Sequence, residues 1–245
     1  KTGSFRAQFL LESLVDLDNN LRKLGSKLLI LKGNPTIEIP KIVQEYGVSD
    51  VFTQQEIAFE ELQTQQQVAS ALQVVNCSLV SIGTSTLYDV QDLPFSITEL
   101  PDVFTNFRKK VEAFASVGVL NTKPMELKSP TIKTNEWPSL ASLGINEPIV
   151  DERAALKFKG GETAAWQRLH HYFYQTQALS SYKETRNGMI GADYSSKFSA
   201  WLALGCISPK SIYYEIKKYE LEFGANESTY WLYFELLWRD YFFSE

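Results

Sequence analysis

The sequence predicts an α/β region with a parallel sheet, followed by an all-helical region. Short apolar runs alternate with helical patterns over residues 1–85, prolines interrupt a polar stretch over residues 86–155, and residues 156–245 show helical patterns without a strand signature. Strand–helix–strand alternation with short connections is typical of a parallel sheet covered by helices. Because two architectures in series usually form two domains, we expect two domains joined by the middle stretch.

The α/β region is predicted to hold three helices and three strands. Apolar residues from Phe5 to Leu24 recur at helical spacing, and Gly25 is a suitable stop. Pro40 falls in the first turn of the second predicted helix, which ends at Gly47. The predicted helices cover residues 4–25, 37–47 and 60–75, and the predicted strands, each a short apolar run, cover residues 26–33, 49–56 and 77–83.

The rest of the chain is predicted to be helical after a long surface connection. The stretch 86–155 contains six prolines and one helical pattern at residues 103–114, and its length would be unusual inside a single compact domain. Ser208 followed by Pro209 is a typical helix start, and Gly205 ends the preceding helix so that the chain can turn back. The later helical patterns cover residues 160–175, 195–205, 208–224 and 228–243.

Composition argues against several classes of protein. The formal net charge of −5 disfavours a generally basic nucleic-acid surface, although it allows a local basic patch. Cys77 and Cys206 lack metal-ligand spacing and lie in apolar contexts, so both are expected to be buried free thiols in a reducing compartment. His170 and His171 are adjacent and would point about 100° apart on a helix, so no metal site is expected.

Neither a membrane segment nor a familiar nucleotide loop is expected. No apolar run is long enough to span a bilayer, and no signal peptide opens the sequence. The residues that follow the predicted strands contain neither GxGxxG nor a Walker loop, which disfavours the usual dinucleotide and P-loop sites. The sequence opens without Met and closes just after a helical pattern, so we expect an excerpt of a longer protein.

A cluster of hydroxyls and one cation stands at the predicted start of the helix at residues 195–205. Ser195, Ser196, Lys197 and Ser199 could bind a phosphate or pyrophosphate there. The reason is that the first turn of a helix has unpaired N–H groups and a partial positive charge. Plain N-capping, worth about 1 kcal/mol, is the competing interpretation, and the spacing alone favours it.

The last helical pattern is crowded with aromatic residues on every face. Such a helix is either a core helix or the support for a flat aromatic ligand or base, and both interpretations stay open. Glu235 and Arg239 lie one turn apart, where an exposed ion pair would be worth roughly a few tenths of a kcal/mol.

Four long motifs occur along the chain. They are FRAQFLLESLVDLDNNLRKLGSKLLILKGNP, GGETAAWQRLHHYF, TRNGMIGADYSSKFSAWLALGCISP and FELLWRDYF. Together, and in this order, they resemble the photolyase/cryptochrome family, and its cryptochrome DASH branch in particular. The resemblance implies a Rossmann-like antenna domain (residues 1–85), an interdomain linker (residues 86–155) and the start of an all-α FAD-binding domain (residues 156–245), with both domains incomplete.

The resemblance also implies which residues hold FAD. Tyr182 would form a wall of the FAD pocket, and the hydroxyls and cation described above would embrace the diphosphate. Arg239 would lie near the flavin and phosphates, while Glu235 and Trp238 would face a cavity that receives a flipped pyrimidine dimer. The implied FAD-binding residues are Tyr182, Ser195, Ser196, Lys197, Phe198, Ser199, Glu235 and Arg239, and the implied catalytic residues are Glu235 and Trp238.

The activity implied by the resemblance is light-driven repair of cyclobutane pyrimidine dimers, preferentially in single-stranded DNA, by a deoxyribodipyrimidine photolyase. A photoreceptor that regulates transcription as a DNA-binding protein, without repair, is the alternative. An α/β nucleotide-binding protein with an unrelated helical domain is a third interpretation. The implied partner is DNA, and the implied protein is a monomer inside the cell, cytoplasmic in a bacterium and organellar or nuclear in a eukaryote.

A folate antenna, 5,10-methenyltetrahydrofolate, is a further implication of the resemblance. Glu56 or Glu60, near the end of the second predicted strand, could bond the aminopyrimidine ring of the pterin. Ligands of parallel sheets lie at the carboxyl ends of the strands, and carboxylates there suit such a ring. A solvated acidic loop is the competing interpretation, and the residues alone favour it.

Overall fold

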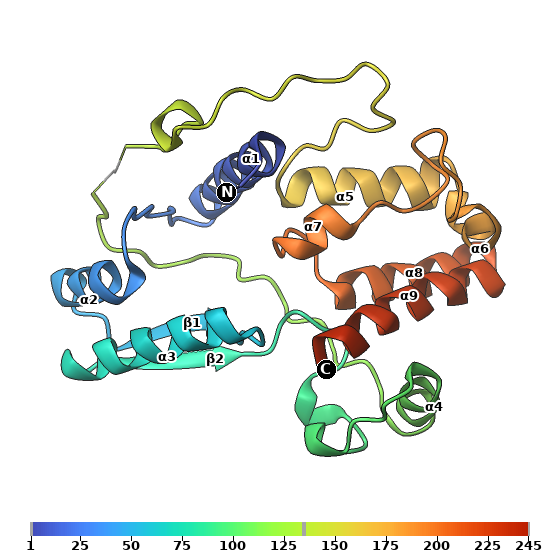
Figure 1. Cartoon of the computed structure of the whole chain (residues 1–245), viewed down its shortest axis with the longest axis horizontal. Coiled ribbons are helices and arrows are strands. Elements are labelled where there is room, and N and C mark those ends of the chain that lie inside the picture. Colours follow the sequence, from blue (N-terminus) through green and yellow to red (C-terminus); the bar gives the residue numbers. More distant parts are fainter. Residues whose placement is uncertain (1, 134–135, 245) are drawn as a thin grey trace. The chain divides into compact units, whose positions relative to one another are not determined.

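A computed structural model describes residues 2–133 and 136–244 (Figure 1). Contacts within the chain divide it into two compact units. The first contains the described residues up to Leu29 and those from Val117 to Trp238, and the second contains Ile30–Ser116 and the described residues from Arg239 onward. The parallel sheet belongs to the second unit and the first is helical, which confirms the predicted fold class. The domain boundaries at residues 85 and 155 stay a prediction.

The second unit contains a small parallel α/β layer. Its strands β1 and β2 pair in parallel, with Asp50 opposite Ser78. The helix α3 connects the two strands, as parallel strands require, and α2 packs against α3. The elements are α2 (Pro35–Tyr46), β1 (Asp50–Gln54), α3 (Phe59–Val74), β2 (Ser78–Ile82) and, further along, α4 (Phe104–Phe114). The buried core of the layer is formed by Val43, Val68, Leu72 and Cys77.

The predicted strand at residues 26–33 is wrong, because residues 26–32 form no regular secondary structure. An extended run becomes a strand only where a neighbouring strand pairs with its backbone. Among the described residues, the sheet contains β1 and β2 alone. The N–H of Leu28 donates instead to the carboxylate of Asp18 at 2.8 Å. A side chain of the preceding helix therefore takes an amide that a strand would use.

The second predicted helix begins earlier than expected. Asn34 is its N-cap and accepts a hydrogen bond from the N–H of Thr36 at 3.0 Å, while Pro35 occupies the first helical position. Pro40 consequently lies inside α2 rather than in its first turn, and its missing N–H removes one helical hydrogen bond. Gly47 ends the helix with a φ of 65°, as predicted.

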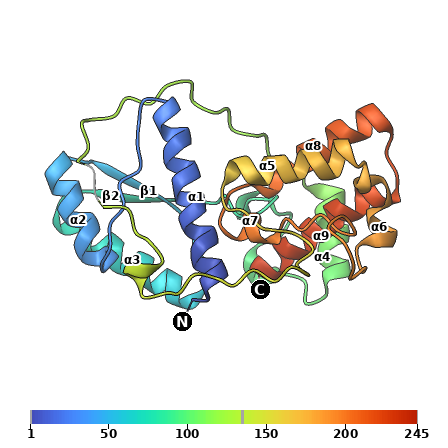
Figure 2. The same ribbon diagram turned by 90° about the horizontal axis from the view of Figure 1, so that it is seen from above.

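The first unit is built from helices. Figure 2 shows α5 and α8 among the helices of this unit. The helix α5 continues into a π-helical turn, His171–Gln175, whose Phe173 ring packs edge-on against Tyr219 of α8. The most deeply buried side chains of this unit include Leu169, Tyr172, Phe173, Ile212 and Ile216. The helices are α1 (Ser4–Lys23), α5 (Glu162–His170), α6 (Tyr182–Thr185), α7 (Ser199–Ala203), α8 (Pro209–Phe223) and α9 (Glu227–Ser244). Only the part of α9 up to Trp238 belongs to this unit.

Three further properties concern membranes, metals and thiols. None of the helices in the described part of the chain has the length and apolar character needed to cross a membrane. Residues 2–133 and 136–244 contain no group of three or more His, Cys, Asp or Glu side chains placed to hold a metal ion. Cys77 is buried, Cys206 is partly buried, and both are free thiols.

The start of α5 is held by carboxylates of α1. Oε2 of Glu12 accepts a hydrogen bond from the N–H of Gly160 at 2.7 Å, and Oδ2 of Asp16 accepts one from the N–H of Thr163 at 3.0 Å. Negative charge is favoured at a helix start, and α5 has no side-chain cap of its own. This approach requires glycine, since a Cβ on Gly160 would lie 2.1 Å from the carbonyl oxygen of Phe9.

Replacing Gly160 with Ala should push α1 away from α5. The new Cβ would overlap the main chain of α1, so the free energy of unfolding of the full-length protein should fall by about 2–3 kcal/mol, as for severe overpacking. Gly83→Ala is the control, because the nearest atom to a Cβ there would be 3.5 Å away. Urea unfolding measures both variants. Equal stability would contradict the close contact assigned to Gly160.

Candidate cofactor-binding site

Of the four residues that were predicted to start a helix, Ser199 does so, whereas the other three lie on the loop before it. The helix α7 begins at Ser199, with Phe198 as its N-cap. Ser195, Ser196 and Lys197 therefore precede its first turn. Lys197 has a φ of 59°, in the left-handed region that residues other than glycine seldom adopt. A residue in this conformation cannot continue a right-handed helix, which explains why α7 starts later than predicted.

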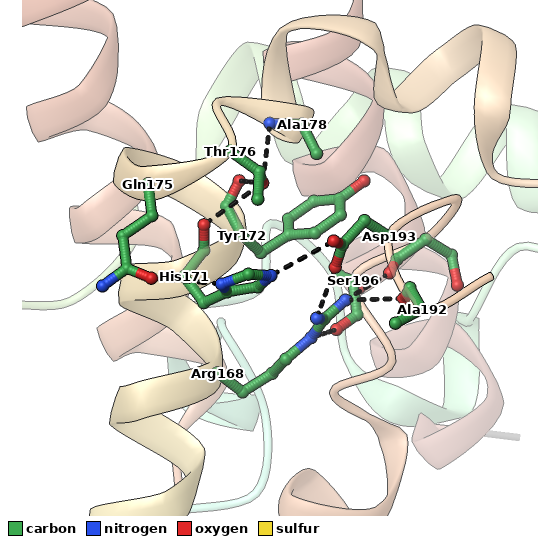
Figure 3. Close-up of polar contacts among 10 residues, drawn as sticks. Arg168, His171, Tyr172, Gln175, Thr176, Ala178, Ala192, Asp193 and Ser196 are labelled. Carbon is green, nitrogen blue, oxygen red and sulfur yellow. Dashed lines mark hydrogen bonds and ion pairs between the residues drawn. The ribbon is translucent and has the colours of Figure 1, made fainter. Parts of the chain in front are cut away.

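Arg168 of α5 holds this loop from within the first unit (Figure 3). Its side chain is 5% exposed, and Nη1 donates to Oδ1 of Asp193 at 2.6 Å. Nε donates to the carbonyl of Ser196 at 3.0 Å, and Nη2 donates to the carbonyls of Ala192 and Ser195, each at 2.9 Å. A buried cation needs acceptors for its N–H groups, and here they all come from one loop.

Asp193 is engaged through both of its carboxylate oxygens. Oδ2 lies 3.1 Å from Nε2 of His171, whose Nδ1 lies 3.1 Å from Oε1 of Gln175 (Figure 3). Burial alone would raise the pKa of Asp193, but hydrogen bonds from Arg168 and His171 outweigh it and hold the pKa below its ordinary value. Asp193 is therefore ionised at neutral pH and balances the buried charge of Arg168.

Tyr182, the predicted wall of the cofactor pocket, begins α6 and is 7% exposed. Its ring meets that of Tyr172 edge-on, with centroids 6.5 Å apart. Burial and the nearby charge of Glu235 raise the pKa of Tyr182 to about 12, against opposing effects of Arg186 and of a hydrogen bond with the Ser196 side chain. The structure therefore brings together three of the residues singled out in the sequence, namely Tyr182, Ser196 and Glu235.

Glu235 of α9 is shared by two donors. Nε of Arg186 lies 3.3 Å from its Oε1, and Nε1 of Trp231 donates to the same oxygen at 3.1 Å. Arg186 also lies over the Trp231 ring, with Cζ 4.7 Å from the ring centroid, and Nζ of Lys183 lies 5.0 Å from that centroid. The carboxylate of Glu235 is thus positioned by a cation and an indole that also contact each other.

Arg239 does not pair with Glu235, although their spacing allowed it. Its guanidinium donates to the carbonyl of Ser85 within the second unit, and Cζ lies 4.3 Å from the ring centroid of Phe243. Burial lowers the pKa of Arg239 from its ordinary value. Trp238 is half-buried. The roles that the resemblance assigns to Arg239 and Trp238 stay predictions.

Lys197 and its neighbour Phe198 have different surroundings. Nζ of Lys197 lies 3.5 Å from the ring centroid of Tyr194. The ring of Phe198 is 3% exposed and packs against Phe173, with centroids 6.1 Å apart. A role of Phe198 in binding a cofactor would therefore fall to its backbone. Ser199, the first residue of α7, is exposed.

Sequence reasoning missed several residues of this site. Arg168 lies on the same face of α5 as Ala165 and, one turn later, Tyr172, and both of these are buried. A single cation on an otherwise apolar helix face is the sequence signal that could have identified a buried arginine with acceptors nearby. The missed residues are Arg168, His171, Arg186 and Asp193.

A second candidate site lies in the second unit. Glu56 and Glu60 line a cavity of about 480 Å³, together with side chains of α2, α3 and both strands. The N–H of Glu56 donates to Oε1 of Gln65, another residue of this cavity, at 3.2 Å. The two carboxylates thus lie just beyond β1 at one cavity, and their contact with a folate stays a prediction.

Comparisons with known proteins give a consistent result over the whole chain. The family model described as DNA photolyase matches residues 1–128. The chain is 50% identical over 243 residues to cryptochrome DASH of Gloeobacter violaceus, covering 99% of this chain and 49% of that protein. It is also 50% identical over 246 residues to cryptochrome DASH of Danio rerio, covering 99% and 47%. The chain spans about half the length of the curated relatives it matches.

Solved structures agree with the sequence comparisons. The crystal structure of the Synechocystis sp. PCC6803 cryptochrome matches with a TM-score of 0.95 and 44% identity, covering 99% of this chain and 50% of that one. A bacterial class III photolyase from Agrobacterium tumefaciens matches with a TM-score of 0.83 and 20% identity, over the same shares. At that identity, the second likeness concerns the fold alone.

The Arg186–Glu235 pair should contribute modestly to stability, because its side chains are 22% and 38% exposed. A double-mutant cycle with Arg186→Ala and Glu235→Gln should give a coupling of about 0.5–1 kcal/mol in the free energy of unfolding. The Lys41–Glu38 pair of α2, whose side chains are 62% and 30% exposed, is the control, with an expected coupling of about 0.2–0.5 kcal/mol. A coupling above about 2 kcal/mol would contradict the partly solvated pair described above.

Proposed function

Because the chain belongs to the DNA photolyase family, we propose that it forms part of a blue-light-absorbing flavoprotein that binds FAD and DNA. One observation supports this most directly. The loop over residues 192–198 carries serine hydroxyls and a lysine, it is held in place by Arg168, and it lies beside the buried Tyr182. The proposal concerns the full-length protein, since its relatives are about twice as long as this chain.

The residues of this loop fit a diphosphate. Serine hydroxyls and a lysine ammonium are donors that suit phosphate oxygens. The loop carries one carboxylate, Asp193, which is paired with Arg168 at 2.6 Å and so repels an anion less than a solitary carboxylate would. We assign Tyr182 to the wall of the FAD pocket and assign the following residues to the diphosphate: Ser195, Ser196, Lys197 and Ser199.

The proposed reaction is the repair of cyclobutane pyrimidine dimers. When bound, FAD would supply an electron donor that blue light excites. The chain's own task is to bind a dimer that has left the base stack, which costs least in single-stranded DNA. Glu235, held by Arg186 and Trp231, would accept a hydrogen bond from a ring N–H of the dimer. Trp238 would stack on the dimer, a contact worth about 1–3 kcal/mol per base.

A photoreceptor that regulates transcription without repair is the second candidate. The curated relatives quoted above are named cryptochromes, and such a protein would use the same FAD pocket. The two candidates differ in what happens to a dimer under blue light, so a repair assay on single- and double-stranded oligonucleotides separates them.

Folate binding, the monomeric state and the location in the cell are further proposals. The cavity beside Glu56 and Glu60 offers carboxylate acceptors for an aminopyrimidine ring. An organellar location in a eukaryote is supported by the name of the Arabidopsis thaliana relative, which includes the words chloroplastic/mitochondrial.

Trp238→Ala should separate substrate binding from cofactor binding. The full-length variant should keep its flavin absorbance but bind a dimer-containing single strand about 5- to 150-fold more weakly, because one stacking contact is lost. Trp137→Ala, at a partly exposed tryptophan of the middle stretch, is the control. In the unsubstituted full-length protein, bound flavin without repair of dimers in single- or double-stranded DNA would favour the photoreceptor. An unsubstituted protein without flavin absorbance would contradict both candidates.

Arg239→Ala tests whether this cation serves the cofactor or the fold. If it lies near the phosphates, as the family resemblance implies, the ratio of flavin to purified protein should fall. Loss of its hydrogen bond to Ser85 should also lower the free energy of unfolding by about 1–3 kcal/mol. Arg239→Lys, which keeps the charge, is the comparison. A destabilised Arg239→Ala variant with full flavin content would assign Arg239 to the Ser85 contact alone.

A further inference from the structure

Arg168 orients three peptide groups of the loop. Its N–H groups bond the carbonyl oxygens of Ala192, Ser195 and Ser196, and no peptide bond among the described residues is cis. In a trans peptide the N–H points opposite to the C=O. The N–H groups that follow these three carbonyls are therefore turned away from Arg168, and they belong to Asp193, Ser196 and Lys197.

None of these three amides has an acceptor within the described part of the chain. The N–H groups of Asp193, Ser196 and Lys197 donate no hydrogen bond, although buried N–H groups nearly always have an acceptor. The amides of Ser196 and Lys197 are adjacent in the chain, whereas that of Asp193 belongs to the residue whose carboxylate binds Arg168. Ser196 is 7% exposed. Lys197 is left-handed, with φ 59°, and Phe198 is right-handed, with φ −74° and ψ −12°. Such alternation of hand at residues 197 and 198 turns the N–H of Lys197 and those of the residues after it into a concave arrangement that suits an anion.

The charge of Arg168 is already balanced inside the protein. Its side chain is 5% exposed, and the carboxylate of Asp193 lies 2.6 Å away. Its four hydrogen bonds are all to the loop. Of the two basic residues that contact the loop from within or beside it, Lys197 is therefore the one whose charge a ligand would meet, and the contribution of Arg168 is the direction in which the loop amides point.

We propose that Arg168 is a positioning residue that presents the backbone N–H groups of Ser196 and Lys197 to the diphosphate of FAD. The inference rests on the proposed function. It extends that function by giving the directional part of diphosphate recognition to the main chain, and by naming the buried side chain that sets this direction.

Arg168→Lys is the informative variant, because it keeps the positive charge but loses the planar guanidinium. The ammonium of lysine cannot bond three carbonyls and a carboxylate at once in the same geometry. The measurement is the affinity of the full-length apoprotein for FAD, for ADP, which carries the diphosphate, and for riboflavin, which carries no phosphate. Affinity for FAD and ADP should fall about 10- to 100-fold, equivalent to one charge-assisted hydrogen bond. Affinity for riboflavin should be unchanged.

The matched control is Arg22→Lys, the same substitution in another arginine–aspartate pair of the first unit, where Nε of Arg22 lies 2.7 Å from Asp18. It should leave all three affinities unchanged. An equal loss of affinity for FAD and riboflavin in Arg168→Lys would show a merely structural role. Unchanged affinity for FAD and ADP would show no role. Either result overturns the inference.

Amide hydrogen exchange in the unmodified protein gives a second test that does not depend on the folding of a variant. On saturation with ADP, exchange at Ser196 and Lys197 should slow at least about 10-fold, as expected when a charged acceptor is bound. The N–H of Cys206, already bonded to the carbonyl of Trp201, should not change. Bound ADP without protection at Ser196 and Lys197 overturns the inference but leaves the proposed function intact. A protein that binds neither FAD nor ADP contradicts both.

Discussion

The bonds between Arg168 and the loop at residues 192–196 are the constraint on which the candidate site depends. A guanidinium that is 5% exposed cannot rely on water, so it needs acceptors from the protein. The loop supplies three carbonyls and the carboxylate of Asp193. A change in the path of this loop would leave a buried cation with too few acceptors, which is costly. One conformation of the loop is therefore favoured before any ligand binds.

The position of Arg168 depends in turn on how α5 is anchored. Glu12 and Asp16 of α1 bond amides at the start of α5, and the ring of Phe173, just after α5, packs against Tyr219. The helix is thus held at both ends, one by charge and hydrogen bonds and the other by aromatic packing. Since hydrogen bonding is directional and packing excludes water, the combination suits a helix that must place one side chain accurately.

Elements with local signals were predictable from the sequence, whereas elements decided by distant partners were not. Gly47 and the Ser208–Pro209 pair mark helix boundaries by their own conformational preferences, and both predictions were confirmed. The run at residues 26–33 has the composition of a strand, but Asp18 takes the amide of Leu28. The site was predictable only in part, because the bonds that define Arg168 reach residues 24–28 positions away, beyond any local pattern.

The lysine of the loop is consistent with recognition by the main chain. An arginine at this position would offer a planar, bidentate group, whereas the ammonium of Lys197 is a compact charge without a preferred direction. Its Nζ lies over the Tyr194 ring, 3.5 Å from the centroid, a contact that holds the charge near the loop. If the loop binds a diphosphate as proposed, the directional bonds must come from its hydroxyls and amides, and Arg168 orients the amides by bonding carbonyls of the same peptide groups. Charge and direction are thus divided between two basic residues, one partly exposed and one buried.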